Sequence, residues 1–526
     1  MRLEAACAAV SACAYDLYDH VPFGSWLCEG DASILWMLAL RGVGLGARAL
    51  RRRACLAVAA WVADIPDESR AAVYAALLPS LVDADLAVSL AACHALNTLI
   101  NDWGFNSADL LEGARAHIGG ADAGATMVQA LMGIVSRCEE LDSHTLGIET
   151  LASLIDRLGP EAKPYCALLA SVLPQAWALS AQQNILLRDR LLVVMRHTTC
   201  ALGEASPTLH AIVLPAIWES TDPARPDDFL ALAVEALRLW RAVLRSAPTA
   251  SDDLLLLLPR LAVLAEMSTE HARSVLSLVE SYVLLAGDAA FIGDGGRAIC
   301  AVFHSMVGQL NDVGTGLMMR ALELSVQAAP RGAVAALSGV LSRVIKLIAS
   351  GDETDTVCGY AACVLSRVAF TAPEVGGGAA GLAALASASG VTGAWPKVVA
   401  IWLGQAYAGM ADAPRRRLLA LGALVLIVQR DASAWSVATP LSEALKQAAR
   451  ESGELPTAAG VSVERSVSFE LYDAGGSGDD ADDEGAEVGR RAALFAQDPA
   501  NAPVLSTTRQ ALASLGNPPE LAALQV

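Results

Sequence analysis

The 526-residue sequence has few aromatic residues and few charged ones. Aromatic residues make up 5% of the chain and charged residues 18%, whereas hydrophobic residues reach 54%, mostly as Ala, Leu and Val. Because strands prefer β-branched and aromatic side chains, this composition favours helices over sheets. The low charge content, next to the high apolar content, excludes disorder over most of the length.

Basic residues are the scarcer of the two charged classes. The chain carries 37 Lys and Arg against 56 Asp and Glu, which gives a formal net charge of −19. Binding to nucleic acid needs clustered cationic surface, so we expect no direct nucleic-acid partner. A negative field of this size attracts basic proteins, and we expect protein partners of that kind.

Motifs of catalysis and metal binding are missing. The sequence has no HExxH, P-loop, GxSxG or kinase signature. Its eleven cysteines and eight histidines form no CxxC pair and no group with metal-ligand spacing. The nearest approaches, Cys93-His94 and His197 with Cys200, lie in helical stretches where a packing role is expected. We therefore expect no enzyme and no catalytic, cofactor-binding or metal-binding residues.

Long, continuous apolar runs are also missing. The uncharged stretch Tyr165–Leu187 contains a proline and several amide side chains, and Val375–Pro396 contains six glycines. Neither is the unbroken block that a bilayer core requires, so we expect a soluble chain with no membrane insertion. The odd number of scattered cysteines favours a reducing cytosol or nucleus.

A repeated phrase is the strongest internal signal. Two apolar residues precede a proline at Pro79, Pro174, Pro215 and Pro259, and the last two intervals are 41 and 44 residues. The first interval, 95 residues, is about two such periods. We interpret each phrase as the end of a helix. A period of roughly 40–47 residues with two helices per unit is typical of HEAT arrays.

The segment around Pro79 shows how one unit is built. Apolar residues at three- and four-residue steps predict a helix that ends near Leu81, and Asp83-Ala84-Asp85 predicts a turn that caps the next helix. The sequence LLPSLVDADLAVSLAACHALNTLI resembles a HEAT repeat, although Ser89 stands where an arginine is usual. Neither helix buries its stripe alone, so stacking of units must supply the core. We expect an all-α, HEAT-repeat (armadillo-like) superhelical solenoid of about ten helix pairs.

The pattern divides the chain into three parts. Residues 1–451 carry the repeats, although 374–396 is rich in Gly, Ala and Ser and is predicted as a poor helix or a loop. Residues 452–489 are Gly-rich and acidic, with GGSGDDADDEGAE at their centre, and we expect a disordered linker. Residues 490–526 regain helical character and are expected to fold back onto the last repeat.

Several stretches go beyond general HEAT character and occur in a fixed order. The clearest are AYDLYDHVPFGSWL (14–27), RALRRRACLAVAAWV (48–62), LNTLINDWGF (96–105), PYCALLASVLPQAWALSAQQNILLRDRLL (164–192), DDFLALAVEALRLWRAVLRSAP (227–248), APRRRLLALGALVL (413–426) and RRAALFAQDP (490–499). Together they resemble the C-terminal part of a nuclear transport receptor of the importin β (karyopherin β) superfamily, in its importin-eleven branch.

That resemblance implies a function in Ran-dependent nuclear import, with protein cargo on the concave face of the solenoid. It also implies contacts with Phe-Gly nucleoporins and shuttling between cytoplasm and nucleus through the pore. Family members are about twice as long, and their N-terminal repeats make the main Ran contact. We therefore expect this chain to lack the N-terminal Ran-binding half. Two alternatives remain: a HEAT scaffold with no transport cycle, and an enzyme subunit with an α/α toroid.

Two tight basic triplets stand out in the acidic sequence, Arg51-Arg52-Arg53 and Arg415-Arg416-Arg417. The simpler interpretation is a solvated helix start whose arginine stems cover apolar neighbours. The alternative hypothesis is that the acidic segment Asp479–Glu487 folds back onto one triplet and competes with basic cargo. The ten tryptophans are mostly expected in the core, with one or two lining grooves for Phe-Gly segments.

Overall fold

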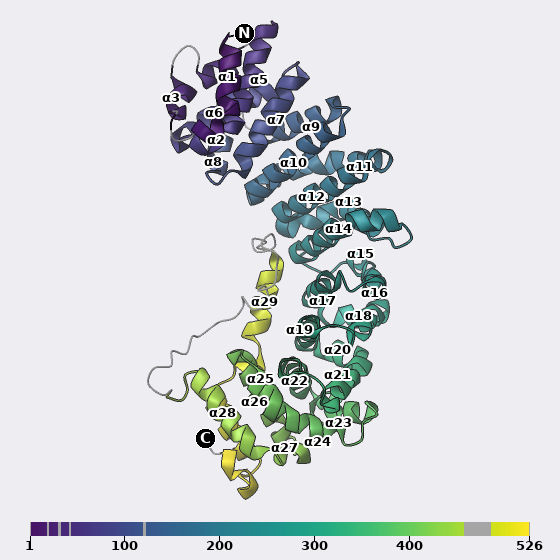
Figure 1. Cartoon of the computed structure of the whole chain (residues 1–526). Coiled ribbons are helices and arrows are strands. Elements are labelled where there is room, and N and C mark those ends of the chain that lie inside the picture. Colours follow the sequence, from purple (N-terminus) through teal and green to yellow (C-terminus); the bar gives the residue numbers. More distant parts are fainter. Residues whose placement is uncertain are drawn as a thin grey trace. The chain divides into compact units, whose positions relative to one another are not determined.

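The computed structural model describes residues 2–17, 20, 22–29, 33–40, 44–118, 123–456 and 485–524 (Figure 1). Every regular element in these ranges is a helix, and no strand occurs among them. The expected all-α fold is therefore confirmed. The chain divides into two compact units, Met1–Ser246 (unit 1) and Ala247–Val526 (unit 2).

Unit 1 consists of α-helices joined by short turns and 3-10 helices. Its α-helices are α1 (Arg2–Ala12), α2 (Ala14–Leu17), α3 (Phe23–Cys28), α4 (Ile34–Ala39), α5 (Leu45–Ala60), α6 (Asp67–Leu81), α7 (Leu86–Asn101), α8 (Ser107–Ile118), α9 (Ala123–Arg137), α10 (Leu141–Leu158), α11 (Cys166–Gln183), α12 (Ile185–Leu202), α13 (His210–Ser220) and α14 (Pro226–Ser246). Its 3-10 helices are η1 (Val62–Asp64), η2 (Gly159–Tyr165) and η3 (Gly203–Leu209).

Unit 2 is built in the same way. Its α-helices are α15 (Asp252–Leu255), α16 (Leu258–Met267), α17 (Ala272–Ala286), α18 (Gly293–Met306), α19 (Asp312–Ala328), α20 (Pro330–Ala336), α21 (Ser338–Ser350), α22 (Asp355–Phe370), α23 (Gly378–Ala388), α24 (Ala394–Ile401), α25 (Tyr407–Gly409), α26 (Ala413–Val428), α27 (Ala432–Trp435), α28 (Ala438–Glu451), α29 (Ala486–Ala496) and α30 (Val504–Ser514). Shorter elements are η4 (Gly287–Phe291), η5 (Pro373–Val375), the π-helical turn η6 (Trp402–Ala406), η9 (Pro499–Asn501) and η10 (Pro519–Leu524).

Each unit has two layers of helices, because the longer helices pack on a partner in a pair and on the equivalent helices of neighbouring pairs. We call the layer of second helices the B layer. In unit 1 it runs through α5, α7, α10, α12 and α14, and in unit 2 through α17, α19, α22, α26 and α28. Stacking of this kind buries stripes that no single pair could cover, as the HEAT pattern predicted.

The pair α6/α7 shows how the sequence sets this packing. Asp85 caps α7 by accepting a hydrogen bond from the backbone N–H of Ala87 at 3.0 Å, which satisfies one of the unpaired donors at the helix start. The apolar stripes of α6 and α7 are both buried, and their Ala residues allow the two helices to approach each other closely. The buried residues are Tyr74, Leu77, Leu78, Leu81, Val88, Ala91, Ala92, Ala95, Leu96 and Leu99.

The missing HEAT arginine on α7 is replaced from another helix. Arg137, at the end of α9, donates hydrogen bonds to the carbonyl oxygen of Asp83 (2.8 Å) and to the hydroxyl of Ser89 (3.0 Å). The Ser89 hydroxyl also donates to the Asp83 carbonyl at 3.0 Å. The turn before α7 is therefore fixed by a guanidinium, as a HEAT turn requires, but one that the repeat itself does not supply.

The expectation that the repeated prolines mark helix ends holds at Pro79, since α6 ends at Leu81 as predicted, but it was wrong at the other three positions. Pro79, Pro174 and Pro215 lie inside α6, α11 and α13, and Pro259 lies in the first turn of α16. An internal proline removes one backbone hydrogen bond, and the burial of the leucines and valines beside it offsets that loss. In α16 the proline costs little, since the first-turn N–H has no helical partner.

The Gly-rich stretch 374–396 contains helix after all. It holds η5, α23 and the start of α24, separated by glycines with positive φ at Gly376, Gly390 and Gly393. Leu382 and Trp395 bury their side chains there. The division into 1–451, 452–489 and 490–526 stays a prediction, and most of its middle part, 457–484, lies outside the described residues.

Two helical stretches, Ile185–Ser220 and Ala272–Phe291, are long and apolar enough to cross a membrane by length and composition, and two bent helix pairs raise the number to four. About half of each stretch is buried inside the protein, at 44% and 50% of the most apolar window. Both contain a B-layer helix that packs against other helices, α12 on α10 and α14, and α17 on α16 and α19, and such packing itself requires an apolar surface. The absence of membrane insertion stays a prediction.

Candidate functional site

The C-terminal segment of unit 2, residues 485–524, lies along the B layer. Helix α29 packs on α17, η9 and α30 pack on α26, and α30 and η10 pack on α28. Figure 1 shows these elements in yellow against the green helices of the same unit. The segment therefore covers helices that would otherwise present their side chains to a partner.

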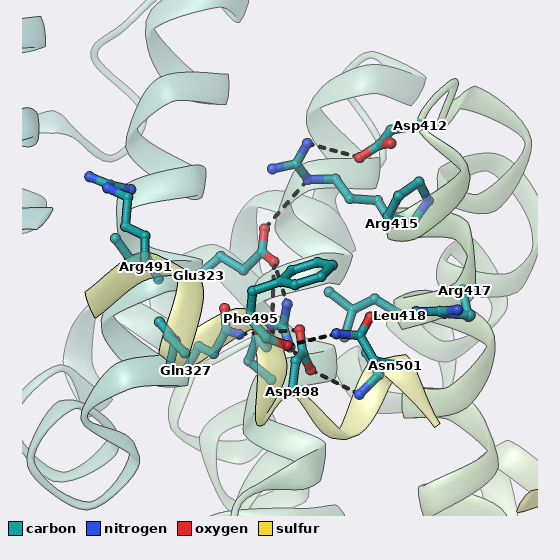
Figure 2. Close-up of a pocket in the computed structure, with 15 residues that line it drawn as sticks. Glu323, Gln327, Asp412, Arg415, Arg417, Leu418, Arg491, Phe495, Asp498 and Asn501 are labelled. Carbon is teal, nitrogen blue, oxygen red and sulfur yellow. Dashed lines mark hydrogen bonds and ion pairs between the residues drawn. The ribbon is translucent and has the colours of Figure 1, made fainter. Parts of the chain in front are cut away.

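A cluster of buried charges lies under this segment (Figure 2). The Arg367 guanidinium on α22 contacts Glu323 of α19 at 3.2 Å and Asp498 at 2.6 Å. Glu323 is 2% exposed, Asp498 7% and Arg367 8%. Gln327 of α19 donates a further hydrogen bond to Asp498 at 3.1 Å. Charges so far from solvent require partners, and Asp498 supplies one from outside the helical layers.

The second basic triplet forms the other side of the cluster. Arg415 contacts Glu323 at 3.5 Å and Asp412 at 3.2 Å, and its guanidinium lies 5.3 Å from the ring centre of Tyr360. Burial raises the pKa of Asp412, while the Arg415 charge acts in the opposite direction. Arg415 is therefore buried and paired, and the expectation of a solvated helix start does not hold for it.

The other two arginines of that triplet also have partners. Arg416 contacts Glu451 at 2.8 Å, and Arg417 donates a hydrogen bond to the side chain of Asn501 in the C-terminal segment. The acidic residues 479–484 of the fold-back hypothesis lie outside the described residues. The triplet does meet the tail, through Asn501 and through the neighbouring cluster at Asp498.

The N-terminal half of the C-terminal segment is held mainly by charge. Arg491 contacts Glu280 of α17 at 3.0 Å and Glu487 of its own helix at 2.8 Å. Burial lowers the pKa of Arg491, but the two carboxylates outweigh it and raise that pKa above its ordinary value. Of the α29 side chains only Glu487 is buried, whereas Val488 is 47% and Phe495 38% exposed.

The C-terminal half is held differently. The Glu454 carboxylate accepts hydrogen bonds from the backbone N–H groups of Val504 (2.6 Å) and Leu505 (2.9 Å), which caps α30 with a negative charge. Apolar side chains of this half are buried in the fold: Ala500, Val504, Leu512, Leu521 and Leu524. Residues 500–524 are thus part of the core, and α29 is the less firmly held part.

A cavity of about 70 Å³ remains beneath α29. Its walls come from Leu324, Leu418, Leu494 and Phe495, and its floor from the charged cluster (Figure 2). A space of this size with polar groups on one side has room for water. The contact of α29 with the B layer is therefore incompletely packed.

Unit 1 presents a polar hollow of about 260 Å³ on its own B layer. Asn101 of α7 donates to the Ser153 hydroxyl of α10 at 3.3 Å, and Glu149 of α10 pairs with Arg190 of α12 at 2.9 Å. His197 Nδ1 lies 2.7 Å from Asp156 Oδ1. Burial would raise the pKa of Asp156, but the hydrogen bond and charge of His197 lower it overall.

The first basic triplet is held within unit 1. Arg51 contacts Asp83 at 2.7 Å and donates to the Leu40 carbonyl, and Arg53 contacts Glu4 at 2.7 Å. Arg51 is buried and Arg53 half-buried. As with Arg415, the sequence predicted a solvated helix start, but Arg51 and Arg53 connect neighbouring helices.

Tryptophans are distributed between core and surface. Trp61, Trp240 and Trp402 are fully buried, and Trp177 and Trp395 nearly so, as expected. Trp36 and Trp218 are partly exposed, and Trp103, just after α7, is completely exposed. These three tryptophans lie at the surface, as do the aromatic side chains of Tyr15 and Phe495. That one or two tryptophans line grooves for Phe-Gly segments stays a prediction.

The histidines and cysteines nearest to a metal-binding pattern have packing roles. Cys93 donates to the Thr150 hydroxyl at 3.3 Å, and His197 is paired with Asp156. Within the described part of the chain, no group of three or more His, Cys, Asp and Glu side chains could hold a metal ion. Buried thiols resist ionisation: burial raises the pKa of Cys55 to about 12 and that of Cys93 to about 11.

Comparisons with known proteins agree with the sequence resemblance. A family described as "Importin-11-like, TPR repeats" matches residues 189–515, more than half of the chain. The chain belongs to this importin-11-like family. It is thereby a member of the importin β superfamily. The family and the fold are those of transport receptors, which are not enzymes.

Curated relatives match about two thirds of the chain. Human Importin-11 is 25% identical over 361 residues, which is 68% of this chain and 35% of that protein. Importin beta-like protein kap113 of Schizosaccharomyces pombe is 24% identical over 365 residues, with 67% and 35% covered. The chain thus spans about a third of the length of the curated relatives it matches.

Solved structures support the fold. Lph2 of S. cerevisiae, described as a bidirectional nuclear transport receptor, matches 97% of this chain and 53% of its own with a TM-score of 0.78 at 17% identity. The exportin Cse1 in its cargo-free, cytoplasmic state matches 97% and 51% with a TM-score of 0.56 at 10% identity. The expected HEAT-type karyopherin fold is confirmed.

Sequence reasoning missed the buried cluster at Glu323. The cluster joins residues from α19, α22, α26 and the C-terminal segment, up to 175 positions apart in sequence (Glu323 to Asp498). One signal was available: Glu323 lies in the middle of an apolar helix, ALELSV, where a lone carboxylate must find a cation.

Proposed function

We propose that the chain is a nuclear transport receptor that binds protein cargo on its HEAT repeats for import into the nucleus. The observation that carries this proposal is membership of the importin-11-like family across 189–515, supported by the fold similarity to a nuclear transport receptor. The chain is proposed to move between cytoplasm and nucleus through the pore, in contact with Phe-Gly nucleoporins and with the GTPase Ran.

Cargo recognition is proposed to be electrostatic. The net charge of −19 attracts basic proteins over several Å, and the attraction weakens with salt because exposed charges are screened. On the B layer of unit 1, Glu149 and Asp156 flank a hollow lined with Asn97 and Asn101. Carboxylates there suit lysine and arginine side chains, and asparagine amides suit a peptide backbone.

The test is binding of a fluorescent basic cargo peptide to the full chain at about 0.1 M and about 0.5 M salt, since screening is strong at the higher value. The double variant Glu149→Gln/Asp156→Asn should weaken binding about fivefold at low salt, as two exposed pairs contribute about 1 kcal/mol together. The control is Asp253→Asn, an exposed acid on α15 of unit 2. Unchanged binding at high salt, or equal loss in the control, contradicts the electrostatic account.

The second candidate is a HEAT scaffold without a transport cycle, favoured by the matched span of only about a third of the curated relatives. A pull-down with GTP-loaded and GDP-loaded Ran separates the two. A transport receptor prefers the GTP-loaded form and releases the cargo peptide when that form binds. A scaffold does not distinguish between the two nucleotide states.

A further inference from the structure

The contacts of α29 follow one face of a helix. Arg491, Leu494 and Phe495 stand at positions i, i+3 and i+4 of α29, and Asp498 follows just after the helix with extended backbone; all four line the cavity above the charged cluster. This spacing is that of a short amphipathic helix in a groove. Arg491 meets Glu280 at one end, and Asp498 meets Arg367 and Gln327 at the other.

Four helices of the B layer supply the surface on which α29 lies. Its acidic end is Glu280 on α17, its basic end is Arg367 on α22, and its apolar walls are Leu324 of α19 and Leu418 of α26. All four residues belong to the B layer. Arg367 also contacts Glu323, so it keeps a carboxylate when Asp498 is absent, whereas departure of α29 leaves Glu280 of α17 without Arg491.

Helix α29 is held less firmly than the elements that follow it. It buries no apolar side chain fully, its contacts with the layer include the Arg491–Glu280 ion pair, and a cavity lies beneath it. Residues 500–524 are anchored by buried apolar side chains and by the Glu454 cap. Opening of α29 is therefore a local event, which costs much less than unfolding of unit 2.

We propose that α29 is an internal occupant of a helix-binding groove on the B layer of unit 2, and that a partner protein inserts a helix of the same chemistry when α29 leaves. The partner segment is a short amphipathic helix with an arginine, apolar residues one turn later, and a carboxylate just beyond its last turn. This inference deepens the proposed function, since it names a class of cargo segment, but the groove itself does not depend on transport.

Because α29 is attached to the groove it fills, it competes at a high effective concentration, roughly millimolar for a flexible connection. A free helix thus binds the wild-type chain weakly. Weakening the internal contacts frees the groove. The double variant Arg491→Ala/Asp498→Ala removes the charge of α29 at Arg491 and the charge just after the helix at Asp498, and it leaves every B-layer residue in place.

The experiment measures binding of a fluorescein-labelled peptide of residues 485–502 to full-length chains at about 0.05 M salt, where exposed charges are weakly screened. The double variant should bind the peptide at least about tenfold more tightly than wild type. Adding Glu280→Arg to the double variant should abolish the gain, and a peptide with Arg491→Glu should restore it. The control variant Arg509→Ala, an exposed arginine on α30, should behave as wild type.

Hydrogen exchange of α29 in the same variants makes the result decisive. Fast exchange of α29 in the double variant without tighter peptide binding overturns the proposal, because the groove is then free and does not accept a helix. Continued protection of α29 also overturns it, because the two ion pairs then do not hold the helix. Ran and nucleoporins take no part in this assay, so its failure is distinct from failure of the proposed transport function.

Discussion

Replacement of Glu323 by alanine tests the buried cluster most severely. Glu323 is 2% exposed and contacts Arg367 at 3.2 Å and Arg415 at 3.5 Å. Its removal leaves two buried guanidiniums on α22 and α26 without the carboxylate between them. Removing one partner from a buried ion pair costs about 3–5 kcal/mol. Asp498 and Asp412 still partly balance the arginines, so we expect a loss near the lower limit, about 3 kcal/mol.

The loss should be visible in two assays. At about 2–4 °C per kcal/mol for a unit of this size, the unfolding midpoint of unit 2 should fall by about 6 °C or more. Hydrogen exchange of α19 and α22 should accelerate by about a hundredfold, since each 1.4 kcal/mol is a factor of ten. Glu323→Gln keeps the shape and one acceptor, and should lie between wild type and Glu323→Ala.

The control for this experiment is Glu443→Ala. Glu443 also pairs with a cation, Lys446 at 2.9 Å, but its side chain is 69% exposed. Exposed pairs contribute about 0–1 kcal/mol, so this variant should stay within about 0.5 kcal/mol of wild type. If Glu323→Ala is as mild as Glu443→Ala, the cluster does not hold the B layer together, and the reasoning is refuted.

Three further predictions concern other parts of the fold. Iodoacetamide at pH 8 should label the exposed Cys13 and Cys28 in the folded protein. It should not label the buried thiols whose pKa is raised to about 11 or 12, which are those of Cys55, Cys93, Cys166 and Cys358. Labelling of these four before unfolding would contradict their burial. Gly113→Ala should destabilise unit 1 by about 1–3 kcal/mol, because its Cβ would lie 2.5 Å from the Ala71 carbonyl oxygen. Gly133→Ala on α9, with open space around it, should instead stabilise by about 0.5–1 kcal/mol; urea unfolding measures both, and a shared sign would refute the packing argument. The pKa of Asp156 in the folded state is below its ordinary 3.8. The ionised carboxylate therefore contributes to the free energy of unfolding at neutral pH, and this contribution disappears as the pH falls through the lowered pKa. Thermal unfolding between pH 3 and 7 should therefore show wild type and Asp156→Asn converging in acid, and a constant difference would contradict the pairing with His197.

The fold was largely predictable because its determinants are local. Apolar stripes at helical spacing and the cap at Asp85 depend on residues within one or two turns, and both were confirmed. The prolines were misinterpreted for the opposite reason. Whether Pro174 ends a helix depends on burial against neighbouring helices, which offsets one lost hydrogen bond and which a local rule does not include.

The candidate site was less predictable because its residues are distant in sequence. The sequence around Asp498 does not indicate that it pairs with Arg367, since the two residues come into contact only in the tertiary fold. The arginine triplet at 415–417 was noticed, but as a surface feature, because sequence alone does not show that Glu323 lies buried beside Arg415. The charge pattern drew attention to the arginines at 415–417, but their partners can be identified only in the tertiary fold.

The central claim, that the chain is a nuclear transport receptor, is tested most directly by nuclear entry. The fluorescently labelled 54.5 kDa chain is added to permeabilised cells beside an inert protein of the same mass and net charge. The account predicts that the chain collects at the nuclear rim and enters nuclei faster than the inert protein, carrying a basic cargo peptide with it. Entry no faster than that of the inert protein, with no rim staining, would contradict it.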